Sequence, residues 1–173
     1  MADAEPQDAF MWFEPNGSIK GESQDKLLQG KGAFQLQEFT IKAENATNIG
    51  SATGGGGGAG KVKFDRLSIK KFSDSATTGF FLALSLGEHF TDAFIELRQN
   101  MVPYLVFNFK MCLISEIETS QSGDDEAEDS IVIDYGAVVI TYFKQYEDGS
   151  LKQDQQAMWS RVYNDASDQV KVV

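Results

Sequence analysis

The chain has little of what catalytic and disulfide-bonded proteins use. It contains one cysteine, one histidine and three prolines in 173 residues. The single cysteine, Cys112, excludes an intrachain disulfide and a cluster of metal-binding thiolates. Because Cys112 lies in the apolar stretch YLVFNFKMCLISEI, we expect it to be a small buried core residue.

The single histidine limits catalysis in the same way. His89 would have to act as the base for a serine or cysteine nucleophile, and neither G-x-S-x-G nor a cysteine-nucleophile motif accompanies it. Its position in GEHF is typical of a polar residue in a helix-to-strand connection. We therefore predict that the protein is not an enzyme. A hydrolase stays a distant alternative, and it would require His89 to be essential.

Positive charge is scarce. The chain has 15 Lys and Arg against 26 Asp and Glu, a formal net charge of −11. This balance argues against a general affinity for nucleic acids or anionic membranes, and no segment approaches a membrane-spanning length. Part of the negative charge lies in GDDEAEDS (123–130), which we expect to be a solvated loop. Its carboxylates at 124–129 lack the spacing of a calcium loop, so we expect no metal and no cofactor.

The N-terminus lacks the features of a secretion signal. MADAEPQDAF is acidic where a signal is basic, and no apolar stretch follows it. We expect the protein to be made in the cytoplasm and to leave by no route that reads an N-terminal signal.

The residues that are abundant predict a folded β-protein. Hydrophobic residues make up 42% of the chain and include thirteen Phe, which is typical of one globular domain over 1–173 with short flexible tails. Apolar and polar residues alternate with period two, as in strands, over seven ranges: 9–13, 33–44, 61–72, 92–99, 102–118, 130–146 and 157–164.

Some of these strands carry further detail. The alternation changes phase between Leu36 and Phe39, which predicts a bulge or bend. Both faces are apolar from Val138 to Phe143, which predicts a segment covered on two sides. In 102–118, one face is predicted to carry Leu105, Phe107, Phe109, Met111 and Leu113.

One short helix is predicted between an N-cap at Asp74 or Ser75 and a stop at Gly87, with Phe80, Phe81 and Leu84 at helical spacing. Several strands, one helix and short turns predict a mainly β fold: a small antiparallel β-barrel of two sheets, or a two-sheet sandwich, with one short α-helix.

The stretch GGGGGAGKV (54–62) is close to the phosphate-binding motif G-x-x-x-x-G-K. Val62 stands where that motif has a magnesium-binding hydroxyl, and a strand rather than a helix is predicted to follow. We therefore expect no nucleotide here, and interpret the region of about 45–60 as an extended, flexible loop between two strands.

Basic residues surround this loop, namely Lys42, Lys61, Lys63, Arg66, Lys70 and Lys71, while acidic residues concentrate at the N-terminus and at 124–129. The separation suggests self-association in which a basic face meets an acidic one head to tail. Ordinary scatter of surface charge is the alternative.

Two motifs carry a resemblance to a known family. IKGESQDK (19–26) and GGGGGAGKV (54–62), in this order and at this distance, resemble the haemolysin-coregulated protein (Hcp) family, the tube proteins of bacterial type VI secretion systems. The resemblance covers most of 9–163. The residues of the first motif that match the family pattern are Gly21, Glu22, Ser23, Asp25 and Lys26.

The resemblance implies a small β-barrel with one helix, six copies of which close into a ring. Rings stack into a tube inside a contractile sheath, carry a spike at the tip, and deliver secreted effectors without a signal peptide. The resemblance also implies that the glycine-rich loop contacts a neighbouring subunit or ring, through Gly54, Gly55, Gly56, Gly57, Gly58, Ala59 and Gly60. A second set of residues is expected to face the ring lumen and its cargo, namely Glu38, Thr40 and Lys42.

Two alternatives stay open beside this hypothesis. A tail-tube protein of a phage or of an extracellular contractile injection particle would share the fold and the ring. A monomeric β-sandwich binding module would instead hold a small ligand with its glycine loop.

Overall fold

The computed structural model describes residues 7–47 and 59–171. Each of the seven predicted ranges overlaps at least one strand. The elements are β1 (Gln7–Glu14), β2 (Phe34–Gln35), β3 (Glu38–Thr40), β4 (Ala43–Thr47), β5 (Ala59–Phe64), β6 (Leu67–Phe72), α1 (Ser75–Leu86), β7 (His89–Gln99), β8 (Val102–Ser120), β9 (Glu128–Gln145) and β10 (Leu151–Ser160).

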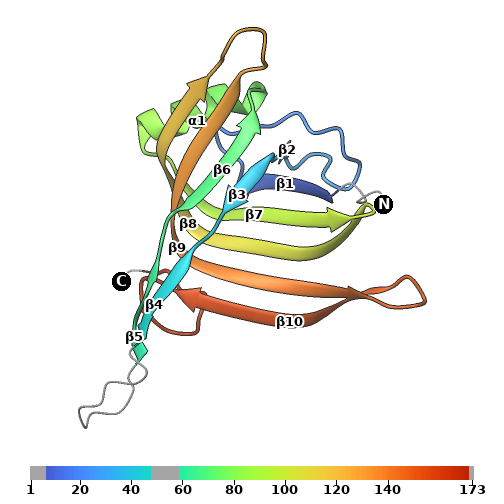
Figure 1. Ribbon diagram of the computed structural model, residues 1–173, viewed down its shortest axis with the longest axis vertical. Helices are drawn as coiled ribbons and strands as arrows, with labels where there is room; N and C mark the ends of the chain where they lie inside the picture. The colour runs from blue at the N-terminus through green and yellow to red at the C-terminus, as the bar shows by residue number, and fades with distance from the viewer. Residues whose placement is uncertain (1–6, 48–58, 172–173) are drawn as a thin grey trace.

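Eight of the strands form one curled antiparallel sheet, and α1 lies across one end of it (Figure 1). The order is β2-β1-β7-β8-β9-β6-β3, and β10 also pairs with β9. One edge of β9 pairs with β8 along most of its length. Its other edge pairs with β6 up to Ile133 and with β10 from Ala137 onward. β4 and β5 form a separate two-stranded sheet that projects from the opposite end.

The segment from Phe34 to Thr40 joins the two ends of the large sheet. Its first residues pair with β1 and its last with β6. Between them, the Leu36 amide donates to the Ala9 carbonyl at 2.8 Å, and the Gln37 amide donates to the Lys70 carbonyl at 2.9 Å. The predicted phase change lies at this crossing, because the segment leaves one partner strand for the other.

The core fills the inside of the curled sheet and continues under α1. The helix contributes Ala76, Phe80 and Ala83, and Phe80 packs edge-on against the rings of Phe13 and Phe34. Burying each phenylalanine stabilises the fold by about 1.5–3 kcal/mol. The predicted caps of α1 are confirmed. The Asp74 carboxylate accepts from the Ala76 amide at 2.9 Å, and Gly87 ends the helix in the left-handed conformation.

The fold class is confirmed as mainly antiparallel β with one short helix, but the prediction for β8 was wrong at its centre. Met111 has a φ of 53°, so the alternation changes phase there. Cys112 and Ile114 are therefore buried in the core, in place of Met111 and Leu113. The last strand was predicted to begin at 157 and begins at Leu151, because its first residues are exposed and polar and have no apolar alternation to reveal them.

Candidate assembly surfaces

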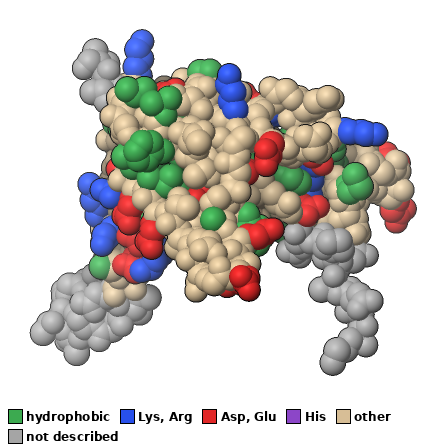
Figure 2. Space-filling view, turned by 90° about the horizontal axis from the view of Figure 1, so that it is seen from above, with side chains coloured by type: hydrophobic (Ala, Val, Ile, Leu, Met, Phe, Trp, Pro, Cys, Tyr) green, Lys and Arg blue, Asp and Glu red, His purple; other side chains and the backbone are tan. Residues whose placement is uncertain are grey.

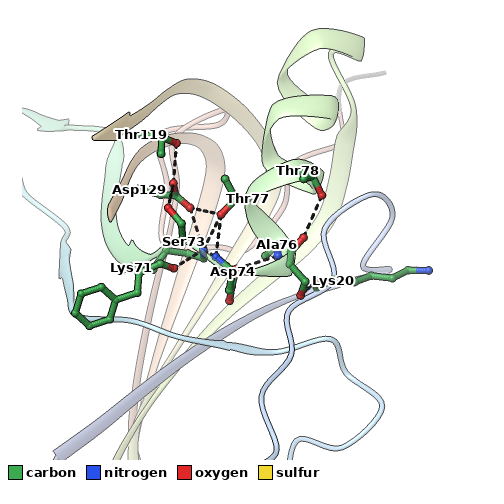
Figure 3. A network of polar contacts seen from close by, with 11 residues as sticks. Lys20, Lys71, Ser73, Asp74, Ala76, Thr77, Thr78, Thr119 and Asp129 are labelled. Carbon is green, nitrogen blue, oxygen red and sulfur yellow. Dashed lines mark hydrogen bonds and ion pairs between the residues drawn. The ribbon is translucent and has the colours of Figure 1, made fainter. Parts of the chain in front are cut away.

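The N-terminus of α1 is fixed by a buried ion pair that links three strands (Figure 3). Lys71 of β6 and Asp129 of β9 are both fully buried, and Lys71 Nζ lies 3.0 Å from Asp129 Oδ2. Lys71 also contacts the helix cap, with Nζ 2.6 Å from Asp74 Oδ1. Thr119 of β8 donates to Asp129 Oδ1 at 2.7 Å.

Further hydrogen bonds satisfy the remaining oxygens of this carboxylate. Ser73 donates to Asp129 Oδ1 at 2.9 Å, and Thr77 in the first turn of α1 donates to Asp129 Oδ2. Burial by itself raises the pKa of Asp129, but the hydrogen bonds from Thr77, Thr119, Lys71 and Ser73 outweigh it and hold this pKa below its usual value. The cluster is saturated with internal partners, so its role is to position α1 and the start of β9.

This pair corrects two predictions. The acidic stretch was expected to be solvated, but Glu128 and Asp129 belong to β9 and Asp129 is buried. Lys71 was counted with the basic surface residues and lies inside the protein instead. The signal was present in the alternation of LSIKKF, where Lys71 continues the buried positions of Leu67 and Ile69.

The G-E-S-x-D-K motif lies in the loop between β1 and β2. Gly21 is required by close packing, because a Cβ there would lie 2.4 Å from the Ala33 carbonyl oxygen. Asp25 Oδ2 lies 2.6 Å from the buried Arg98 Nη1. The hydrogen bond from Arg98 lowers the pKa of Asp25. Ser23 donates its amide to Ala33 O at 3.0 Å, while the Glu22 and Lys26 side chains are exposed.

The Asp25–Arg98 pair ties this loop to β7. Arg98 is 2% exposed, pairs also with Glu96, and lies over the Phe10 ring with its Cζ 5.0 Å from the centroid. The motif therefore closes the loop over the outer side of the sheet, where Trp12 and Phe94 stack at 5.2 Å.

Most of the predicted glycine-loop contact lies outside the described residues. Gly54 to Gly58 belong to that part, while Ala59 and Gly60 begin β5 and residues 45–47 belong to β4. The loop is therefore shorter than the predicted 45–60, because pairing between β4 and β5 extends to Thr47 and Ala59.

The predicted lumen residues share the outward face of their segment. Glu38, Thr40 and Lys42 are exposed, while Phe39 packs on the Phe107 ring at a centroid distance of 5.4 Å. The predicted alternation is confirmed. Glu38 is 3.4 Å from Lys70 Nζ, and Lys42 pairs with Glu44 and with Asp65, the latter at 3.8 Å.

α1 presents apolar side chains to solvent on the side away from the core. Phe81 is 65% exposed, Leu82 47% and Leu86 69%. Figure 2 looks down on this end of the molecule, and hydrophobic side chains gather on one side of that view. Phe81 also lines an apolar groove of about 450 Å³, together with Thr77, Thr78, Ile117 and Thr119. Sequence periodicity missed this surface, because Phe81 was assigned to the same face as Phe80.

A second groove lies at the tip of the β8–β9 hairpin. It has a volume of about 460 Å³, and Phe72, 47% exposed, contributes its apolar part. The polar lining consists of Ser120, Gln121, Ser122, Asp125, Glu126 and Glu128.

The residues considered for catalysis are not brought together. His89 is exposed at the start of β7, whereas Cys112 is buried in the core. Burial raises the pKa of the Cys112 thiol, so this residue is a poor nucleophile. Within 7–47 and 59–171, no group of three or more His, Cys, Asp or Glu side chains is arranged to hold a metal ion. No helix in the described part of the chain combines the length and apolar character needed to cross a membrane.

Comparisons with known proteins agree with this architecture. Residues 10–142 match the model of the family described as "Type VI secretion system effector, Hcp". The chain is 33% identical to Protein hcp1 of Pseudomonas aeruginosa over 139 residues, which cover 78% of this chain and 83% of the relative.

Solved structures share the fold. One, described as a type six secretion system protein, has a TM-score of 0.80 at 20% identity and covers 94% of this chain and 100% of its own. Hcp1 from Salmonella typhimurium has a TM-score of 0.72 at 19% identity and covers 93% and 99%.

Proposed function

The chain belongs to the Hcp family, the secreted proteins that form the inner tube of type VI secretion systems, and we propose that its copies close into hexameric rings that stack end to end. Proteins of this family are structural rather than enzymatic. The dispersed positions of His89 and Cys112 fit that role. What this protein contributes is therefore a set of surfaces through which copies meet.

The apolar surface of α1 is the observation that carries the proposal. Three large side chains, Phe81, Leu82 and Leu86, are between 47% and 69% exposed, and Phe81 also lines an apolar groove. Several large apolar side chains exposed on one helix are typical of sites covered by another protein. We assign a neighbouring copy as the cover, because tube formation requires copies to contact one another.

The interior of the ring is proposed to be lined in part by Glu38, Thr40 and Lys42. Their shared outward face, with Phe39 and Ile41 packed against the core behind them, supports this assignment. Mixed charges and a hydroxyl would give cargo a wetted wall. The proposed partners beyond other copies are effectors carried in the lumen, the spike at the tube tip and the contractile sheath.

The proposal includes a location for each stage. The protein resides in the cytoplasm until the tube is fired, and it leaves the cell through the type VI apparatus. The glycine-rich loop, Gly54 to Gly60, is proposed to contact a neighbouring subunit or ring. Replacing Gly56 and Gly57 with leucine is then expected to weaken stacking and to leave the barrel folded.

The direct test is the mass of the purified protein by size exclusion with light scattering, followed by negative-stain images. We expect a mass of six subunits and ring-shaped particles. A monomer at high protein concentration would overturn the proposal and favour the monomeric binding module.

A further inference from the structure

The two hairpins that project furthest lie at opposite ends of the molecule. Figure 1 has the longest axis vertical, with the β8–β9 hairpin at the top and the β4–β5 hairpin at the bottom. A contact that joins the top of one copy to the bottom of the next is heterologous and does not close. It therefore generates an open-ended stack.

The upper end carries acidic side chains without internal cations. Asp124, Asp125 and Glu126 are exposed, and none of them pairs with a lysine or arginine of the described residues. Asp125 and Glu126 line the groove at Phe72, whose ring supplies an apolar wall. The upper end therefore offers a pocket that is both acidic and partly apolar.

This groove is built on a rigid base. The buried Asp129 at the foot of the hairpin is held by Lys71 and Thr119, and Ser120 pairs with Glu128 above it. At the tip, the Asp125 amide donates to the Ser122 carbonyl at 3.0 Å. These hydrogen bonds hold the backbone that carries the carboxylates of the groove.

The lower end carries the complementary charge. Lys61 and Lys63 of β5 are exposed and, by the period of a strand, lie on one face, while Val62 lies on the other. Within the described chain neither forms a salt bridge, although Lys63 lies opposite Glu44 of β4 and attracts its carboxylate. The exposed cations closer to the barrel do form salt bridges: Lys42 with Glu44 and Asp65, Lys70 with Glu38, and Arg66 with Asp134 at 3.9 Å.

We propose that the acidic groove at Phe72 of one copy receives the Lys61–Lys63 face of the β4–β5 hairpin of a second copy stacked above it. The inference rests on the proposed function and specifies the residues of the end-to-end contact. Lys61 and Lys63 pair with Asp125 and Glu126, and the aliphatic parts of the two lysine side chains pack on the Phe72 ring. Because the charged groups lie at a solvent-exposed contact, salt weakens the association.

The test is disulfide trapping between two single-cysteine additions, Lys63→Cys and Glu126→Cys, mixed as separate proteins under mild oxidation. The native Cys112 is buried and does not compete. Lys63→Cys mixed with Asp154→Cys, at an exposed site on β10, is the matched control. The linked peptides are quantified by mass spectrometry, at low salt and in 1 M NaCl.

We expect the 63–126 disulfide to exceed the control several-fold at low salt and to fall in 1 M NaCl. A yield no higher than the control overturns the inference. The particle mass of each mixture, measured by light scattering before oxidation, tests the hexameric ring separately from the end-to-end contact. If rings form without the disulfide, the end-to-end contact alone is refuted. If the disulfide forms without rings, the hexamer alone is refuted. If rings and disulfide are both absent, both proposals are refuted.

Discussion

Lys71 Nζ and Asp129 Oδ2 lie 3.0 Å apart on directly paired residues of neighbouring strands, and neither side chain reaches solvent. The pair stands at the end of the core face of β6, where α1 closes the barrel. It joins the helix cap Asp74 to both long strands, because Thr119 of β8 contacts the same carboxylate. The position of α1 and the shape of the acidic hairpin both depend on it.

Removing the anion is predicted to destabilise the fold. Asp129→Asn leaves Asp74 as the remaining carboxylate partner of the buried Lys71 ammonium and weakens the hydrogen bonds that converge on residue 129, which costs about 1–3 kcal/mol. Urea unfolding measures the change. Glu128→Gln, one residue away and exposed, is the matched control and is expected to change stability by less than about 0.5 kcal/mol. Equal effects of the two substitutions would contradict the role assigned to the buried pair.

The same carboxylate is predicted to make stability fall at low pH. The pKa of Asp129 is lower in the folded protein than in the unfolded chain, so its contribution is present above about pH 4 and is lost as pH falls through the folded value. Asp25, whose pKa is also lowered, acts in the same direction. Unfolding free energies from about pH 6 to pH 3 should decline less steeply in Asp129→Asn than in the native protein. Parallel curves would contradict the assignment.

In the G-E-S-x-D-K motif, substitution of Gly21 is predicted to destabilise the fold, whereas substitution of Glu22 is predicted to leave its stability unchanged. Gly21→Ala brings its new methyl group against the Ala33 carbonyl, and we expect a loss of about 1–3 kcal/mol from overpacking. Glu22→Ala changes an exposed side chain, so its melting temperature should match that of the native protein. If Gly21→Ala melts at the native temperature, the loop has more room than its packing indicates.

Polar substitution on α1 is predicted to weaken assembly and leave the fold intact. Phe81→Ser and Leu86→Ser alter side chains that are 65% and 69% exposed, so the free subunit loses little buried area. Light scattering should show a lower particle mass at equal concentration, with an unchanged unfolding midpoint in the dissociated protein. Leu27→Ser, an equally exposed leucine in the loop after β1, is the control and should keep the native mass. Native mass in all three variants would mean that no copy covers α1.

The sequence by itself determined the local elements. Period-two alternation located the strands, and Asp74 and Gly87 marked the ends of α1, because caps and periodicity are properties of neighbouring residues. The order and spacing of two short motifs indicated the family. The sequence pattern predicted the strands least well where a strand is irregular or lacks apolar alternation. At Met111 one residue in the left-handed conformation reversed the faces of β8, and the exposed polar start of β10 gave no signal at all.

Only the tertiary structure decided which charges are surface groups and which are core. GDDEAEDS and LSIKKF each look like ordinary charged segments, and 58 positions separate Lys71 from Asp129. The register between β6 and β9 places the two side by side, under the first turn of a helix that shields them from water. Their burial follows from long-range strand pairing, which fixes side-chain neighbours that no local pattern contains. Within the described residues, the same pairing leaves Lys61 and Lys63 at one end of the molecule, and Asp124, Asp125 and Glu126 at the other, without a salt-bridge partner.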